Sequence, residues 1–207
     1  MSIDWQKSFA AVWRSRKGYL RPIAHIDRID FGQLVGIDAQ RQALMANTER
    51  FLAGLGANNV LLWGSRGTGK SSLIKALFNH YKGQGLRLIQ VDRNDLIELP
   101  EIVDELRELP LHFIIFCDDL TFESGEASYR ALKSVLDGSI EAPPDNVLIY
   151  ATSNRRHLLP ETMAENQEAH LVGDDLHLGD TIEEKLALSD RFGLWLSFYP
   201  VNWQAYL

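Results

Sequence analysis

Five largely apolar stretches recur along the chain, and each is followed by glycine or polar residues. They lie at residues 60–63, 86–91, 113–117, 147–151 and 194–199. Short apolar runs bounded by turn residues are typical of strands that are buried on both faces of a sheet. Segments with helical spacing of apolar residues precede or separate them, at about residues 39–51, 72–78, 100–109 and 127–136. Because strands and helices alternate, we expect an α/β protein with a parallel sheet and helices on both of its faces.

The first 22 residues have a different pattern. Trp5, Phe9 and Trp13 recur every four residues, which predicts that they share one face of a helix. Basic residues flank or follow them: Lys7, Arg14, Arg16, Lys17 and Arg21. One interpretation is an arm that binds a partner or nucleic acid, and the other is a helix whose aromatic face packs on the main domain. We prefer the packed helix, because aromatic stripes usually belong to a core.

A glycine-rich stretch connects the strand at 60–63 to the helix that follows it. Its sequence is Gly64-Ser65-Arg66-Gly67-Thr68-Gly69-Lys70-Ser71, with Ser72 next. This spacing is the P-loop pattern, in which glycines let successive backbone N–H groups point into one phosphate-binding concavity. The beginning of the helix adds positive potential, Lys70 would reach the β- and γ-phosphates, and the Ser71 hydroxyl would bind Mg²⁺. The stretch therefore predicts binding of a nucleoside triphosphate.

Composition narrows the class of protein. The 207 residues are 45% hydrophobic, which allows one sizeable core, and the formal net charge of −7 argues against a surface built broadly for nucleic acid. Cys117 is the one cysteine and lies in an apolar run, which predicts a buried thiol in a reducing compartment. No apolar stretch is long enough to cross a membrane and no signal peptide is evident, so we expect a cytoplasmic protein. His170 and His177 lie in the acidic residues 160–184, which we expect to be solvated surface without a metal site.

From about Phe31 to Tyr199 the chain resembles the AAA+ ATPases, and within them an uncharacterised bacterial group known only as a domain of unknown function. Besides the P-loop, the resemblance rests on Leu34-Val35-Gly36-Ile37, Asp118-Asp119-Leu120, Thr152-Ser153-Asn154 and Ser189-Asp190-Arg191-Phe192-Gly193-Leu194. It implies a three-layer α/β/α sandwich with a five-stranded parallel sheet of order 5-1-4-3-2. We accordingly expect a leader at residues 1–30, a nucleotide-binding domain at 31–200, and at 201–207 the beginning of a helical lid. The lid is expected to be absent or truncated, or replaced by a partner.

The same resemblance implies roles for particular side chains. Val35 and Gly36 would line the adenine pocket. Asp118 is similar to the Walker B aspartate, which would hold Mg²⁺ together with Ser71, although a carboxylate that caps a loop is the alternative. Asn154 resembles sensor 1, which positions water near the γ-phosphate, and the alternative is an asparagine that caps the turn after its strand.

Asp119 departs from the AAA+ pattern, because the superfamily usually has glutamate at this position to orient the attacking water. Aspartate shortens the arm by one methylene, and a displacement of about 1 Å can cost on the order of 10²-fold in rate. Three interpretations follow: slow hydrolysis with Asp119, hydrolysis with Glu123 as the base, or binding without turnover. We prefer slow hydrolysis with Asp119.

Arg191 resembles the arginine finger, which stabilises the transferred phosphoryl group across a subunit interface. This role implies a head-to-tail homo-oligomer. Arg155 and Arg156 are alternative candidates, and the non-catalytic interpretation of Arg191 is a salt bridge with Asp190 or Glu184.

The leading functional hypothesis is an ATPase that uses ATP and Mg²⁺ to do conformational work on a macromolecular partner. The alternative is a nucleotide-gated loader or adaptor that binds ATP and hydrolyses it negligibly. DNA, a protein client and a partner ATPase all stay open as the client. Three other classes are disfavoured. The chain has no clear acceptor pocket of a small-molecule kinase, no Asn-Lys-x-Asp segment of a GTPase, and no Ser-Gly-Gly signature of an ABC transporter subunit.

Overall fold

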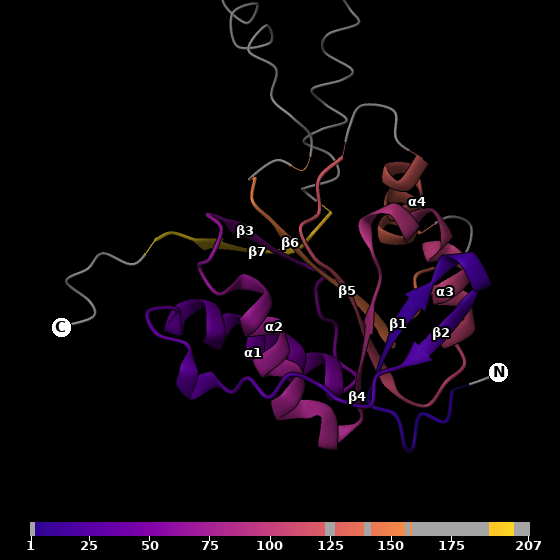
Figure 1. Cartoon of the computed structure of the whole chain (residues 1–207), viewed down its shortest axis with the longest axis horizontal. Coiled ribbons are helices and arrows are strands. Elements are labelled where there is room, and N and C mark those ends of the chain that lie inside the picture. Colours follow the sequence, from indigo (N-terminus) through magenta and orange to yellow (C-terminus); the bar gives the residue numbers. More distant parts are fainter. Residues whose placement is uncertain (1–2, 123–126, 139–141, 156–157, 159–190, 201–207) are drawn as a thin grey trace, which may run out of the picture.

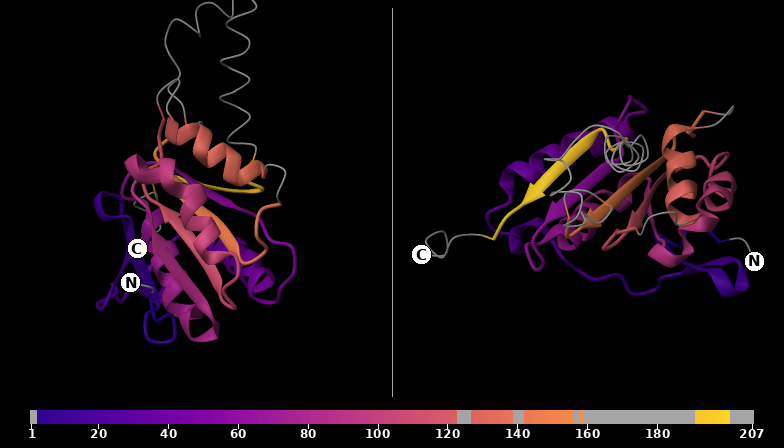
Figure 2. Two further views of the ribbon diagram at one scale, coloured as in Figure 1. Left: turned by 90° about the vertical axis from the view of Figure 1, so that its right-hand side faces the viewer. Right: turned by 90° about the horizontal axis from the view of Figure 1, so that it is seen from above.

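A mixed β-sheet with helices on both faces forms the centre of the molecule (Figures 1 and 2). The computed structural model describes residues 3–122, 127–138, 142–155, 158 and 191–200. The strands are β1 (Ala10–Arg14), β2 (Tyr19–Pro22), β3 (Val60–Gly64), β4 (Leu86–Gln90), β5 (His112–Cys117), β6 (Val147–Ser153) and β7 (Leu194–Phe198). The α-helices are α1 (Asp38–Leu52), α2 (Lys70–Tyr81), α3 (Leu99–Leu106) and α4 (Ala127–Asp137).

Successive residues of the central strands face two separate cores. Val60 and Leu62 of β3 pack in the core that contains α1 and α2. Leu61, between them, packs in the core that contains α3 and α4. Both faces of the strand are therefore buried, which explains its continuous apolar sequence. Cys117 at the end of β5 is buried as expected, and burial raises the pKa of its thiol to about 12.

The expected sheet of five strands is wrong in its number of strands and in its full order. In the described part of the chain the sheet has seven strands, ordered β2-β1-β4-β5-β6-β3-β7. The additional strands β1 and β2 form an antiparallel hairpin, and β1 joins β4 in parallel. The five strands expected from the sequence, β3 to β7, remain neighbours of one another within this sheet. The strand that precedes the P-loop, β3, is interior, between β6 and β7.

The helix expected within residues 1–22 is also wrong, because the hairpin occupies this segment. Trp5 and Trp13 are 9% and 5% exposed and pack in the core beside α3, so the expectation that they pack on the main domain is confirmed. The expected single aromatic face is wrong as well, because Phe9 packs against the other core, beside α1 and α2, and Trp5 lies in a turn before β1. Pairing with β4 is a non-local contact that the local pattern does not reveal.

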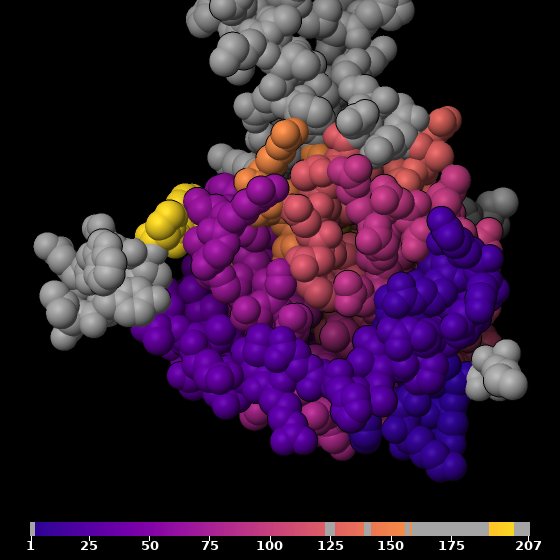
Figure 3. Space-filling view, in the orientation of Figure 1, coloured from indigo at the N-terminus to yellow at the C-terminus, as the bar shows by residue number. Residues whose placement is uncertain are grey.

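Residues 23–37 cross the molecule from the hairpin to α1, as the indigo band over the lower part of the face in Figure 3 shows. The segment is held on α2, since Asn79 Nδ2 donates to the carbonyls of Asp27 and Ile29 at 2.7 and 3.0 Å. Lys75 also pairs with Asp27, at 3.2 Å. The crossing delivers Gly36 and Ile37 to the P-loop. Among the described residues, no helix is both long and apolar enough to span a membrane.

Candidate nucleotide-binding site

The loop from Gly64 to Gly69 turns tightly between β3 and α2. Gly64 has a φ of 131°, and a Cβ on it would lie 2.0 Å from the carbonyl oxygen of Phe198 in β7. Gly67 and Gly69 have φ of 74° and 91°, which favour glycine. The N–H of Ser65 donates to the same Phe198 carbonyl at 3.2 Å. Packing against β7 and the turn itself therefore explain why glycines recur in this loop.

Lys70 begins α2, and its side chain folds back over the loop. It is 7% exposed, and its Nζ donates to the carbonyls of Gly64 and Ser65, both at 2.7 Å, and to Asn154 Oδ1 at 3.3 Å. Burial lowers the pKa of Lys70, while the carboxylates of Asp119 and Asp118 act in the opposite direction. The loop thus carries a positive charge that neutral carbonyls hold in place, and an anion can attract it away from them.

Asp118 lies directly after β5 and accepts hydrogen bonds from two hydroxyl groups. Ser71 Oγ donates to Asp118 Oδ1 at 2.6 Å, and Thr152 Oγ1 donates to the same oxygen at 2.5 Å. Thr152 belongs to β6 and is 2% exposed. Hydroxyl and carboxylate oxygens are the hard donors that Mg²⁺ prefers. The pair Ser71 and Asp118 therefore fits a magnesium ion.

Asp119 has a φ of 54°, the one positive φ among the described residues that are not glycine. Aspartate tolerates this left-handed conformation better than most side chains do. Its N–H donates to Thr152 Oγ1 at 2.9 Å, and Asn154 Nδ2 donates to its Oδ1. Arg66 Nη2 lies 4.0 Å from the other carboxylate oxygen. Thr152 thus holds the backbone of Asp119, and Asn154 holds its side chain.

These side chains surround one hollow of about 370 Å³ at the carboxyl edge of the parallel strands. This edge is where open α/β sheets bind ligands. The lining residues are Arg66, Gly67, Thr68, Gly69, Lys70, Ser71, Ser72, Asp118, Asp119, Thr152 and Asn154. The fold therefore brings the predicted P-loop, Asp118, Asp119 and Asn154 together, and it adds Thr152, for which no role was predicted.

Val35 and Gly36 do not line this hollow. Val35 is 55% exposed, and Gly36 has a φ of 76° that turns the chain toward α1. The next residue, Ile37, is buried, and its Cδ1 lies 3.8 Å from the position that a Cβ on Gly69 would take. Ile37 therefore lies beside the P-loop, and the adenine-pocket role of Val35 and Gly36 stays a prediction.

Arg191 lies near the amino ends of the parallel strands, whereas the P-loop lies at their carboxyl ends. It precedes β7, whose first residue, Leu194, pairs with Val60 at the beginning of β3. Its guanidinium pairs with Asp137 at the end of α4. Arg155, one of the alternative candidates, is exposed after β6 and does not line the hollow.

Several expected features lie outside the described residues. They are Glu123, Arg156, the acidic residues 160–184 with His170 and His177, Ser189 and Asp190, and the lid residues 201–207.

Residues 6–207 match a family described as "Protein of unknown function (DUF815)". The chain belongs to this family. No curated protein matches the sequence.

Solved structures resemble this DUF815 chain in fold. A crystal structure of DnaI has 19% identity and a TM-score of 0.51, covering 95% of this chain and 98% of its own. AMPPCP-bound DnaA from Aquifex aeolicus has 18% identity and a TM-score of 0.52, covering 84% of this chain and 51% of its own. ORC1 from Aeropyrum pernix in complex with DNA has 16% identity and a TM-score of 0.54, covering 81% of this chain and 46% of its own.

The DUF815 chain thus spans about half the length of the DnaA and ORC1 chains. Identities this low show a shared fold, which is that of the AAA+ P-loop ATPases. The expected resemblance to an AAA+ group known only as a domain of unknown function is confirmed.

Proposed function

We propose that this DUF815 protein binds Mg-ATP in the hollow at the carboxyl edge of the sheet and hydrolyses it slowly. The observation that carries the proposal is the convergence of Lys70, Ser71, Asp118, Asp119 and Asn154, from three separate parts of the chain, on one hollow. A cation, two oxygen donors for a metal, and a carboxylate paired with an amide are the parts that phosphoryl transfer to water requires. The structure of DnaA with AMPPCP, an ATP analogue, supports adenine nucleotide as the ligand.

Binding is expected to begin with Lys70. Its ammonium now bonds to the carbonyls of Gly64 and Ser65. A triphosphate offers charged oxygens, which make hydrogen bonds about twice as strong as neutral carbonyls do. Ser71 and Asp118 would hold Mg²⁺, which neutralises charge on the β- and γ-phosphate oxygens.

Asp119 is the proposed base that orients the attacking water. Asn154 bonds both to this carboxylate and to Lys70 Nζ, so the three groups form one chain of hydrogen bonds. Movement of Lys70 toward a phosphate would remove one bond of Asn154 and leave its amide beside Asp119. The slow rate of hydrolysis follows from the aspartate side chain, which is one methylene shorter than that of glutamate.

The same contacts favour a second candidate function, a nucleotide-gated module with negligible hydrolysis. The carboxylate of Asp119 accepts from Asn154 and lies 4.0 Å from Arg66, and these contacts compete with the hydrogen bond that would orient an attacking water. ATP binding without turnover would then switch a partner interaction.

We further propose that Arg191 completes the site of a neighbouring subunit. Arg191 lies near the amino ends of the strands, and its own P-loop follows the carboxyl end of β3. The five residues of β3, at about 3.3 Å each, separate the two. Only a neighbour packed head-to-tail could present this arginine to a γ-phosphate. In the absence of a neighbouring subunit, Asp137 would hold the guanidinium of Arg191. The client is a macromolecule, and the ORC1 structure with DNA makes DNA one candidate.

Calorimetry and phosphate release together test the proposal. Calorimetry with Mg²⁺ should show ATP binding and no preference for GTP. Phosphate release should be measurable for the wild type and lost in Asp119→Asn, whereas the matched change Asp145→Asn, at an exposed carboxylate away from the hollow, should keep it. ATP binding without phosphate release in the wild type would favour the gated module, and absence of ATP binding would refute both.

A further inference from the structure

The hairpin of β1 and β2 carries a concentration of positive charge in an acidic protein. Residues 5–26 contain five of the 21 lysines and arginines and none of the 28 aspartates and glutamates. Arg14, Arg16, Lys17 and Arg21 are exposed, and none of them forms an ion pair with another residue of the described chain. Arg16 and Lys17 form the tip, in the short 3₁₀ helix η1 (Ser15–Lys17). Exposed cations without partners attract polyanions.

The core holds this hairpin rigidly. Three residue pairs join β1 to β4, from Ala10↔Leu88 to Val12↔Gln90. Trp13 is buried, and its Nε1 donates to Glu98 at 2.8 Å. Behind the tip, Gly18 takes a φ of 57° and returns its N–H to the carbonyl of Ser15 at 3.1 Å. The four cations are therefore displayed on a preformed element rather than on a loose arm, which limits the ordering cost of binding.

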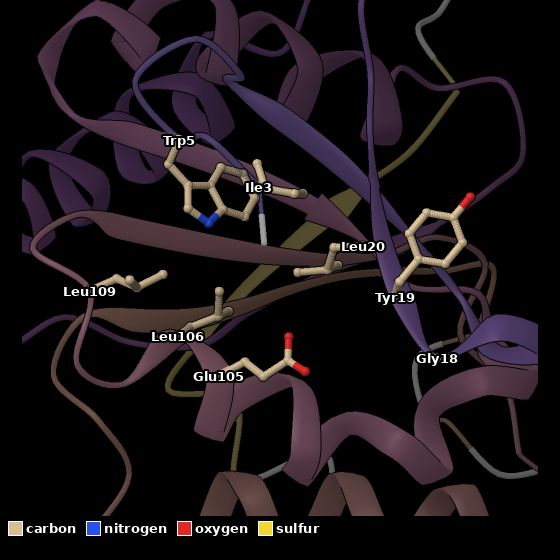
Figure 4. A pocket seen from close by; sticks show the side chains of 8 residues that line it. All are labelled: Ile3, Trp5, Gly18, Tyr19, Leu20, Glu105, Leu106 and Leu109. Atoms are coloured by element: carbon tan, nitrogen blue, oxygen red, sulfur yellow. The ribbon is translucent and has the colours of Figure 1, made fainter. Parts of the chain in front are cut away.

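A hollow of about 400 Å³ with both polar and apolar lining adjoins the tip, between β2 and α3. Figure 4 shows the indole of Trp5 and the carboxylate of Glu105 pointing toward it from opposite walls, with Tyr19 at the rim. Leu20, Leu106 and Leu109 supply apolar lining. No described residue bonds to the Trp5 Nε1 donor or to the Glu105 carboxylate. A planar ligand with both hydrogen-bond donors and acceptors would satisfy these two groups.

We propose that the hairpin and the hollow together bind single-stranded nucleic acid. Phosphates would contact Arg16 and Lys17 at the tip, and one unstacked base would enter the hollow against Trp5. Its exocyclic amine would donate to Glu105, since carboxylates accept from base amino groups. Alternation of cations and aromatic surface is how proteins bind single strands. This assignment names a partner class for the ATPase proposed above, but the surface lies apart from the P-loop.

A single strand fits this surface better than a duplex does. The hollow can take a base only when the base is free of its stack. Asp92 and Asp95 line a second groove together with Arg14 and Arg21, so the attraction for phosphates is strongest at the tip, at Arg16 and Lys17. The hairpin tip follows the carboxyl end of β1, which is parallel to β4, so it lies at the same edge of the sheet as the P-loop. Four strand spacings of about 4.8 Å separate β1 from β3.

Fluorescence anisotropy of the nucleotide-free protein with a labelled, mixed-sequence DNA strand tests the proposal. Arg16→Gln/Lys17→Gln should lower the slope of log K against log salt by about 1.4, or about 0.7 for each lost contact, and weaken binding on the order of tenfold at low salt. The matched control, Arg28→Gln/Arg130→Gln, removes two exposed charges elsewhere and should bind like the wild type. All four positions are exposed, so both variants should keep the wild-type melting temperature. Equal losses in both variants would show a general charge effect and overturn the assignment, as would the absence of strand binding at about 50 mM salt.

An abasic strand of the same length tests the hollow. It keeps the phosphates and lacks the bases, so it should bind the wild type more weakly than the base-bearing strand. The duplex should also bind more weakly than the single strand. Equal binding of the abasic strand, or tighter binding of the duplex, would contradict a base in the hollow. Because ATP is absent from these measurements, their failure would leave the calorimetric result for ATP unchanged.

Discussion

Replacement of Thr152 by valine should damage stability and turnover together. The change keeps the shape of the side chain and removes one hydroxyl. That hydroxyl donates to Asp118 at 2.5 Å and accepts from the Asp119 N–H at 2.9 Å. A hydrogen bond to a charged group contributes about 1.5–3 kcal/mol, and an N–H left without a partner costs about 1–3 kcal/mol. We expect the free energy of unfolding to fall by about 3 kcal/mol.

Turnover should fall by more than ATP affinity. Thr152 sets the position of two carboxylates, and a shift of about 1 Å costs on the order of 10²-fold in rate. Lys70 and the P-loop are untouched, so calorimetric ATP affinity should change little. Urea unfolding gives the stability, and phosphate release gives the turnover.

Two further variants separate positioning from stability. Thr152→Ser keeps the hydroxyl and should keep most of the turnover. Thr48→Val removes an equally buried hydroxyl that bonds to Tyr150 and Leu44, in the core away from the site. It should lower stability with little effect on turnover. If Thr152→Val turns over like the wild type, or if Thr48→Val loses as much activity, the positioning argument is refuted.

Three more predictions follow from the site. Lys70→Ala should abolish tight ATP binding in calorimetry, because it removes the mobile cation of the loop; unchanged affinity would refute the P-loop assignment. Gly64→Ala should lower the free energy of unfolding far more than Gly67→Ala, because its Cβ would meet the Phe198 carbonyl at 2.0 Å whereas Gly67 faces open space. Similar urea midpoints for the two would contradict the packing argument. Arg191→Ala should keep ATP binding and lose turnover by up to about 10³-fold, and mixing it with Lys70→Ala should restore some phosphate release. Concentration-independent turnover in a monomer, unaffected by Arg191→Ala, would refute a role in trans.

Local sequence was sufficient for the part of the site that is continuous in the chain. Strand, glycine loop and helix follow one another from Val60 to Phe78, so spacing alone predicts a phosphate-binding loop that contains Lys70 and Ser71. Asp118 was also accessible from sequence, because a polar residue after a buried parallel strand must lie at the carboxyl edge of the sheet. The strands β3 to β7 were recognisable for a related reason, since burial on both faces leaves continuous apolar runs.

Tertiary structure decided whatever depends on which elements become neighbours. The four-residue spacing of Trp5, Phe9 and Trp13 predicts one face of a helix, but pairing with β4 made the segment a hairpin, with Phe9 in the other core. Nothing in the local sequence distinguishes Thr152 from other strand residues. The pairing of β5 with β6 places its hydroxyl between Asp118 and Asp119. These contacts join residues far apart in sequence, and their free energy exists only once the sheet has formed. Local periodicity therefore specifies the elements, whereas the order of the strands specifies the site.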